Sequence, residues 1–152
     1  MGKTVRELGE MKLVGVRVLC PGDQFLSEIP KASHMLSKRI NEIKHVVHPL
    51  LQFGAFVVEN QSAEEDGYWV CVEVNEYEDI PSDLVTLTVP PQRYAVSRHK
   101  GANDQIMKWY EELHAWIDDN NYSRRKEKWH LEKFYSWRDP ENVELELFDT
   151  IE

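Results

Sequence analysis

A chain of 152 residues is long enough to bury one hydrophobic core and short for two. Its formal net charge of −9 argues against a surface that follows nucleic-acid phosphates, because such surfaces are basic. No segment approaches the ~20 apolar residues of a membrane-spanning helix, and residues 1–12 lack the apolar stretch of a secretory signal. We therefore expect one cytoplasmic domain, residues 1–152, that binds neither nucleic acid directly nor membranes.

Hydrophobic periodicity predicts alternating strands and helices along the chain. Residues 11–19 alternate apolar and polar side chains, as a half-buried strand does. Between residues 29 and 47 the apolar side chains recur every three or four positions, which predicts a helix that ends before Pro49. The remaining pattern predicts strands at 54–59, 68–74, 84–89, around Tyr94 and Val96, at 128–137 and at 143–148, with a second helix at about 103–119.

The expected element order is β-α-β-β, a connecting strand, and β-α-β-β again. The repetition lies in the order of elements and not in the residues themselves. Two such units, about 11–77 and 84–149, are expected to place their sheets edge to edge with the helices on one side. The cleft between the halves is then the default place for a ligand.

The strand at 68–74 has two unlike faces. Val70, Val72 and Val74 form an aliphatic face suited to packing on a helix. Trp69, Cys71 and Glu73 form the other face, which is unusual for a plain core or a plain surface. Trp69 and Glu73 either line a ligand pocket or simply cover the sheet and face water.

Cysteine, histidine and basic residues give little sign of further chemistry. Cys20 and Cys71 are too few for a disulfide framework and stand in no CxxC pair. Of the six histidines, only His130 pairs with an acid, Glu132, on one strand face, and two ligands do not make a zinc site. We expect no metal and no cofactor. The densest basic run, residues 124–126, is interpreted as a solvated turn.

Several short motifs occur in a recognisable order. Residues 90–96, PPQRYAV, are similar to the "PgxYAV" strand of GyrI-like domains, and residues 99–101, HKG, resemble the turn that follows it. Residues 110–116 resemble the family's helix, and residues 121–122 its "gY" exit. The family's "E-x-Y" strand motif is matched by residues 131–134, LEKF, and its third strand and following turn by residues 67–74 and 80–81.

The resemblance to the GyrI-like, AraC-type effector-binding family, in its stand-alone form, implies an α+β fold. It implies two β-α-β-β repeats related by a pseudo-twofold axis, with antiparallel sheets, helices on one side and a ligand cleft between the halves. The glutamate of "E-x-Y" is the family's usual ligand-contacting acid, and Glu132 matches it. The sequence departs from the pattern at Phe134, where the family has tyrosine.

We therefore expect a non-catalytic module that binds or senses an aromatic or lipophilic cationic small molecule, without its own DNA-binding domain but with a possible protein partner. Rings around a buried carboxylate add cation–π attraction to charge neutralisation. The predicted ligand-binding residues are Glu132, Trp69, Phe134, Glu73 and Tyr94. One alternative is a hydrolase of strained electrophilic natural products that uses Glu132 as general base. Another is an inhibitor protein that acts through protein–protein contact.

Overall fold

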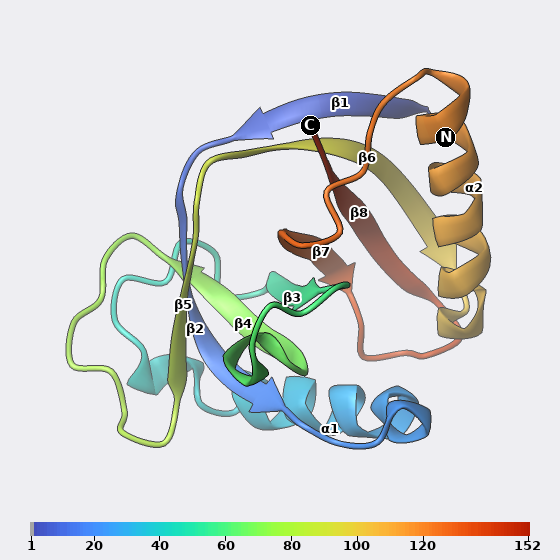
Figure 1. Ribbon diagram of the computed structural model, residues 1–152. Coiled ribbons are helices and arrows are strands. Elements are labelled where there is room, and N and C mark those ends of the chain that lie inside the picture. The colour runs from blue at the N-terminus through green and yellow to red at the C-terminus, as the bar shows by residue number, and fades with distance from the viewer. Residues whose placement is uncertain (1) are drawn as a thin grey trace.

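The computed structural model describes residues 2–152, which form one eight-stranded antiparallel sheet and two α-helices (Figure 1). The strands lie in the order β1-β6-β8-β7-β3-β4-β2-β5. The α+β fold expected from the sequence is confirmed. The strands are β1 (Lys3–Leu8), β2 (Met11–Val18), β3 (Gln52–Val57), β4 (Tyr68–Val74), β5 (Val85–Val89), β6 (Gln92–Gly101), β7 (Trp129–Ser136) and β8 (Val143–Ile151). The helices are α1 (Phe25–Ser37) and α2 (Ile106–Asp119), with short 3-10 turns at Gly22–Gln24, Ile40–Glu42, Ala63–Glu65 and Asn103–Gln105.

Both helices cover the same face of the sheet. Leu36 of α1 packs among the β2 and β4 valines, and Leu113 of α2 packs against Leu145 and Leu147 of β8. Cross-strand partners point to one side of a sheet, so the register identifies this face across all the central strands. A single row on it runs Val70–Gly54–Glu132–Leu147, across β4, β3, β7 and β8.

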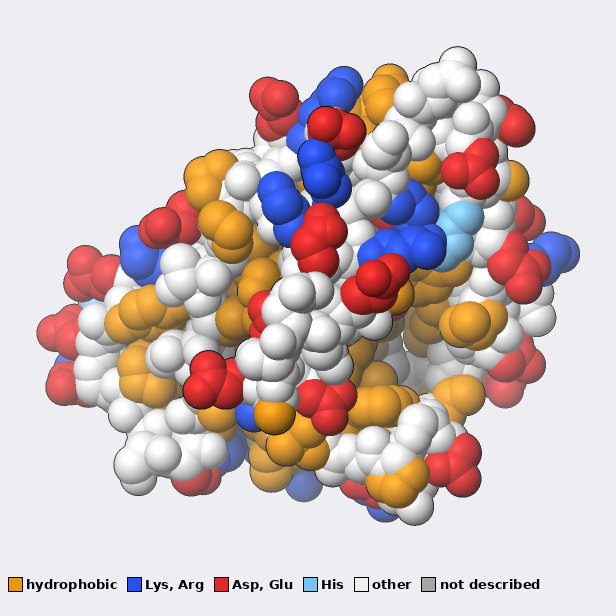
Figure 2. Space-filling view, viewed as in Figure 1, with side chains coloured by type: hydrophobic (Ala, Val, Ile, Leu, Met, Phe, Trp, Pro, Cys, Tyr) orange, Lys and Arg blue, Asp and Glu red, His pale blue; other side chains and the backbone are white. Residues whose placement is uncertain are grey.

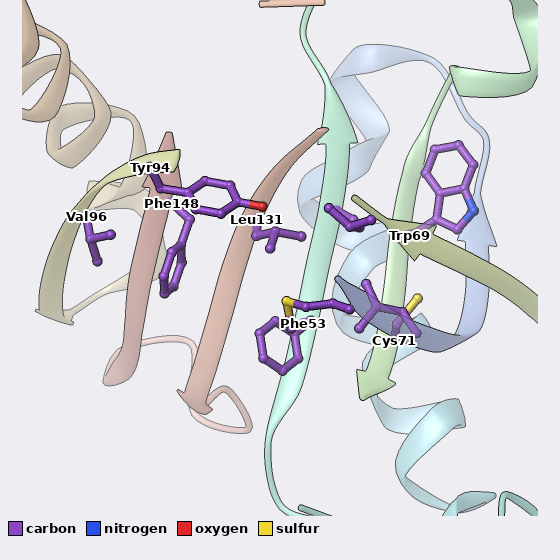
Figure 3. Close-up of a cluster of buried hydrophobic side chains, with 11 residues drawn as sticks. Phe53, Trp69, Cys71, Tyr94, Val96, Leu131 and Phe148 are labelled. Atoms are coloured by element: carbon purple, nitrogen blue, oxygen red, sulfur yellow. The ribbon is translucent and has the colours of Figure 1, made fainter. Parts of the chain in front are cut away.

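The opposite face forms a separate core. The next row along the strands runs Trp69–Ala55–Leu131–Phe148–Val96, and these side chains belong to one buried cluster. Figure 3 shows the cluster, with Tyr94 against Phe148 and Phe53 near Cys71. Because the sheet is strongly bent, residues from most of its strands meet on this side without a helix to cover them.

The two ends of the sheet are tied together by one bent ribbon. The pairing of β1 with β6 runs from Lys3↔Ser97 to Leu8↔Gln92, and the pairing of β2 with β5 continues in the same register from Met11↔Val89 to Gly15↔Val85. Strand β1 leads into β2, and β5 leads into β6, so each half of the chain supplies a strand to the edge of the other (Figure 1).

Two parts of the fold differ from the sequence prediction. The helix expected at 29–47 begins at Phe25 and ends at Ser37, and the rest of that range is a 3-10 turn at Ile40–Glu42, a positive φ of 65° at His45 and a β-bridge of Val46 with Val74. The helical period continued past Ser37 because the following apolar residues, although not helical, pack into the same cluster as α1. Strand β1 was not predicted, because its residues are mostly polar. In residues 2–152 no helix is both long and apolar enough to span a membrane.

Candidate functional site: a cavity between the two helices

A cavity of about 710 Å³ opens between α1 and α2 on the helix-covered face of the sheet. Its volume lies in the range of pockets that enclose drug-sized molecules. Figure 2 shows the opening as a hollow lined by hydrophobic side chains, with Lys, Arg and His side chains along one part of its rim. The apolar walls come from both helices and from the sheet: Phe25, Leu26 and Ile29, then Ile106 and Met107, then Phe56, Phe134 and Trp137.

Glu132, in the middle of β7, supplies a buried carboxylate to this cavity. Its side chain points to the helix-covered face and the residue is 7% exposed. Tyr68 of β4 donates its hydroxyl hydrogen to Oε1 at 2.5 Å, and Tyr110 of α2 donates to Oε2 at 2.5 Å. Both oxygens thus have a phenol partner, and no cationic side chain in residues 2–152 forms an ion pair with this carboxylate.

Gly54 makes the Tyr68–Glu132 contact possible. Strand β3 lies between β4 and β7, and Gly54 is the residue of β3 that stands directly beside Glu132 in the row. A Cβ at position 54 would lie 1.6 Å from the Tyr68 hydroxyl oxygen and 2.3 Å from Cζ of its ring. The tyrosine therefore crosses β3 through space that only glycine leaves open.

An aromatic wall surrounds the carboxylate. The Phe56 ring stacks on Tyr68 at 6.0 Å between ring centres and on His130 at 5.6 Å. Tyr110 meets the same Phe56 ring edge-on at 6.4 Å. Flat rings on several sides of one negative group provide cation–π surfaces next to a charge.

Burial dominates the acid–base chemistry of this group. Burial raises the pKa of Glu132, and the hydrogen bonds from Tyr110 and Tyr68 offset only part of that rise, so the pKa stays above its ordinary value. Burial, together with the charge of Glu132, raises the pKa of both Tyr68 and Tyr110, so the phenols stay protonated as donors. The site is therefore a carboxylate whose charge is incompletely compensated.

A second polar cluster, centred on Asp149 of β8, lies at the same cavity. His114 Nε2 lies 2.6 Å from Oδ2, Arg124 donates from Nε to Oδ1 at 3.0 Å, and His130 Nδ1 lies 3.3 Å from Oδ1. Burial raises the pKa of Asp149, but the hydrogen bond from His114 and the charges of His130 and Arg124 outweigh it, so the pKa lies below its ordinary value. Burial lowers the pKa of His130.

The structure places the five predicted ligand-binding residues on two faces of the sheet. Glu132 and Phe134 line the cavity. Trp69 and Tyr94 do not line it: they lie in the core on the opposite face, where Trp69 packs edge-on against Trp129 and Tyr94 against Phe148.

Glu73 shares the opposite face with Trp69, where burial raises its pKa and Lys133 counteracts part of the rise. The prediction that Trp69, Tyr94 and Glu73 lie beside Glu132 is therefore wrong. Alternation along a strand decides the point, since residues 69 and 73 point away from residues 68, 70 and 72.

The ligand-binding residues predicted from the sequence include neither of the two phenols that hold Glu132. Tyr68 lies two residues before Val70 on β4, so strand alternation alone places both side chains on the helix-covered face of the sheet. Tyr110 lies four residues after Ile106 and four before His114, and all three face the cavity from α2. The basic run was also misread in part, because Arg124 and Lys126 line the cavity.

The structure brings one group of possible metal ligands together within residues 2–152. Nε2 of His45 lies 3.0 Å from Glu76 and 2.6 Å from Glu78, and all three residues are exposed, away from the cavity. The pair His130 and Glu132 does not form a ligand set, since Glu132 is bound by phenols and His130 contacts the Arg125 carbonyl oxygen at 3.2 Å.

A bent antiparallel sheet with two helices around an apolar cavity defines a small-molecule-binding domain. The model of the family described as "GyrI-like small molecule binding domain" matches residues 3–148, and the chain belongs to this family. The resemblance noted in the sequence is thus confirmed over nearly the whole chain. A search of curated proteins finds no match.

Solved structures share the fold at low sequence identity. SAV2435 bound to tetraphenylphosphonium is 17% identical with a TM-score of 0.74, over 100% of this chain and 94% of that chain. EcmrR, in a complex with DNA, is 17% identical with a TM-score of 0.73, over 99% of this chain and 57% of that chain. The present chain therefore spans little more than half the length of EcmrR. A hydrolase from Listeria innocua is 10% identical with a TM-score of 0.59, over 99% of this chain and 91% of that chain.

Proposed function

We propose that this protein binds aromatic or lipophilic cations in the cavity between α1 and α2, with Glu132 as the charge partner and Phe134 among the ring walls. The observation that carries the proposal is a buried carboxylate, facing an apolar cavity, whose two oxygens are held by neutral phenols. A buried negative charge without a cationic partner is costly, and a cationic ligand relieves that cost. The tetraphenylphosphonium bound to SAV2435, a protein of the same fold, supports this ligand class.

The biological role that fits such a site is sensing or sequestration of the compound. The fold likeness to EcmrR, whose structure contains DNA, supports a link to transcription regulation that depends on a partner carrying the DNA-binding surface. The net charge of −9 supports the absence of direct nucleic-acid binding. We also propose a cytoplasmic location, as expected from the composition of the sequence.

Titration calorimetry with tetraphenylphosphonium tests the proposal. Replacing Glu132→Gln keeps the shape of the side chain and removes its charge, and we expect affinity to fall about ten- to a hundredfold, or about 1–3 kcal/mol. Glu73→Gln is the matched control, because Glu73 lies on the opposite face of the sheet and is also partly buried. Triphenylphosphine oxide keeps three of the rings without the charge, so its affinity should respond much less to Glu132→Gln. Equal binding of the phosphonium by the parent and the Glu132→Gln variant would remove Glu132 as the charge partner.

A second candidate function is hydrolysis of strained electrophilic compounds. It is favoured by the two phenols at Glu132, since Tyr68 and Tyr110 supply the hydroxyl groups that Phe134 lacks. Glu132, with its raised pKa, would take a proton from water while the water oxygen bonds to an electrophilic ring carbon. The strained carbon–carbon bond would break, the other carbon would receive a proton from a tyrosine, and that tyrosine would regain a proton from the protonated Glu132 to which it is hydrogen-bonded. Turnover of an activated cyclopropane, lost in the Glu132→Gln variant, would favour this function over binding alone.

A further inference from the structure

We propose that the cavity has a second, positively charged subsite, formed by Arg124 and Lys126, which binds the carboxylate of an amphoteric aromatic ligand whose cationic end meets Glu132. This inference rests on the proposed cation-binding function and narrows the ligand class. Both basic side chains line the cavity. In Figure 2, Lys and Arg side chains lie next to a histidine at the edge of the apolar hollow.

The Arg124 side chain is fixed by one hydrogen bond and keeps further N–H donors unused. Its Nε donates to Asp149 Oδ1 at 3.0 Å, and its side chain is 19% exposed. No hydrogen bond within residues 2–152 uses its two terminal nitrogens, which leaves a fork of N–H donors for a ligand. A guanidinium fixed on one side and free on the other suits bidentate recognition of a carboxylate.

Lys126 adds a charge that is not neutralised by a neighbour. Its backbone oxygen accepts from the amide of Glu59, which fixes the segment, while its side chain is exposed and forms no ion pair within the described residues. Asp149 offsets one positive charge only, so the pair of Arg124 and Lys126 leaves a net positive end.

The other negative groups at the cavity have partners already. Asp149 is fully buried, and its oxygens are shared among His114, Arg124 and His130. Asp66, in the segment before β4, accepts from the Asn60 amide. Asp66 is exposed, whereas Glu132 is the buried carboxylate that faces the cavity without a cationic partner among the described residues, and it lies apart from the basic end.

The spacing between the two charged ends fits one ring system. Leu147 is the direct cross-strand partner of Glu132, and Asp149 lies two residues further along β8 on the same face. Diagonal neighbours of this kind are about 7–8 Å apart. Arg124 forms a β-bridge with Ile151, two residues past Asp149, so an aromatic compound with a cationic ring system and a carboxylate on an attached ring can reach both groups.

Two dyes that differ by one methyl ester test the subsite. Rhodamine 110 carries a delocalised cation and a free carboxylate, whereas rhodamine 123 is its methyl ester and carries the cation only. Fluorescence anisotropy at neutral pH should show that Arg124→Gln and Lys126→Gln each weaken rhodamine 110 by about tenfold and rhodamine 123 by less than twofold. Lys128→Gln is the control, because this exposed lysine follows the same segment and does not line the cavity. Arg124→Lys retains a charge near Asp149 and should recover part of the affinity for rhodamine 110 if the Gln variant is less stable.

The outcomes separate this inference from the function on which it rests. If the substitutions weaken both dyes equally, or weaken neither, the basic subsite is wrong and cation binding at Glu132 stands. If the parent protein binds rhodamine 123 and not rhodamine 110, the subsite is also wrong. If the parent binds neither dye and no tetraphenylphosphonium, both the subsite and the proposed function are wrong.

Discussion

Replacing Gly54 with alanine is the most direct test of how this site is built. An added Cβ lies 1.6 Å from the Tyr68 hydroxyl oxygen, whereas ordinary contacts begin at 3.4 Å. The hydroxyl must therefore move by roughly 2 Å, which is enough to break a hydrogen bond of this length. The Tyr68–Glu132 contact is lost, and the ring must leave its present packing against Phe56.

The expected loss of stability is about 2–4 kcal/mol, from overpacking together with a lost hydrogen bond to a charged group. Urea unfolding followed by fluorescence measures it. The sign is informative, because Gly→Ala within a strand ordinarily stabilises by about 0.5–1 kcal/mol. Gly9→Ala is the matched control, since a Cβ there meets nothing within 4 Å.

A second substitution tests the cause. In a Tyr68→Val background the ring is absent, so Gly54→Ala should become neutral or stabilising. A Gly54→Ala protein as stable as the parent, or an equal loss in the Tyr68→Val background, would show that the passage through β3 is not what glycine provides.

Further predictions concern the two buried acids and the emission of one tryptophan. The pKa of Glu132 is raised in the folded state, so this residue stabilises the fold most below pH 4.5, its ordinary pKa, and the stabilisation is lost as pH rises through the raised pKa. The free energy of unfolding of the parent, relative to that of the Glu132→Gln variant, should therefore increase as pH falls. Cation affinity should change in the opposite sense and weaken as pH falls, with proton release on binding near that pKa by calorimetry in different buffers. Asp149→Asn should cost about 3–5 kcal/mol at neutral pH in urea unfolding, with the cost present above the ordinary pKa of 3.8 and shrinking as pH falls through the lowered pKa. Trp137→Phe should abolish most of the ligand-induced change in tryptophan emission, because Trp137 lines the cavity whereas Trp69 lies on the other face; an unchanged response would place the ligand elsewhere.

Periodicity was a reliable guide where one face of an element is buried against the other layer of the fold, a helix on the sheet or the sheet on a helix. The strand at 68–74 and the helix at about 103–119 have that character, and both occur within a few residues of the prediction. The N-terminal strand β1 has no such face. It is formed by pairing with β6, more than half the chain away, and a local pattern of side chains carries no record of that partner.

The residues of the site were likewise predicted where a local pattern identifies them and missed where the pairing of distant strands does. Glu132 and Phe134 were found through a motif on a single strand, and strand alternation places both on one face. Which of two unlike faces on β4 would meet Glu132 depends on the register of three strands and on a glycine between them. The aromatic, polar face with Trp69 was the wrong choice because tryptophan and glutamate also cover the outer core.

The bent ribbon that joins the ends of the sheet has a consequence for how the protein folds. Lys3 pairs with Ser97 and Gly15 with Val85, so the closing strands come together only after the chain between them has been made and brought back. Contacts of such long sequence separation slow folding, since the entropy of the intervening loop is lost before the pairs form. We therefore expect the pairing of β1 with β6 and of β2 with β5 to be the slow step of folding. Once formed, these long-range pairings join the two halves at both ends of the sheet, in addition to the pairing of β3 with β7 at its centre.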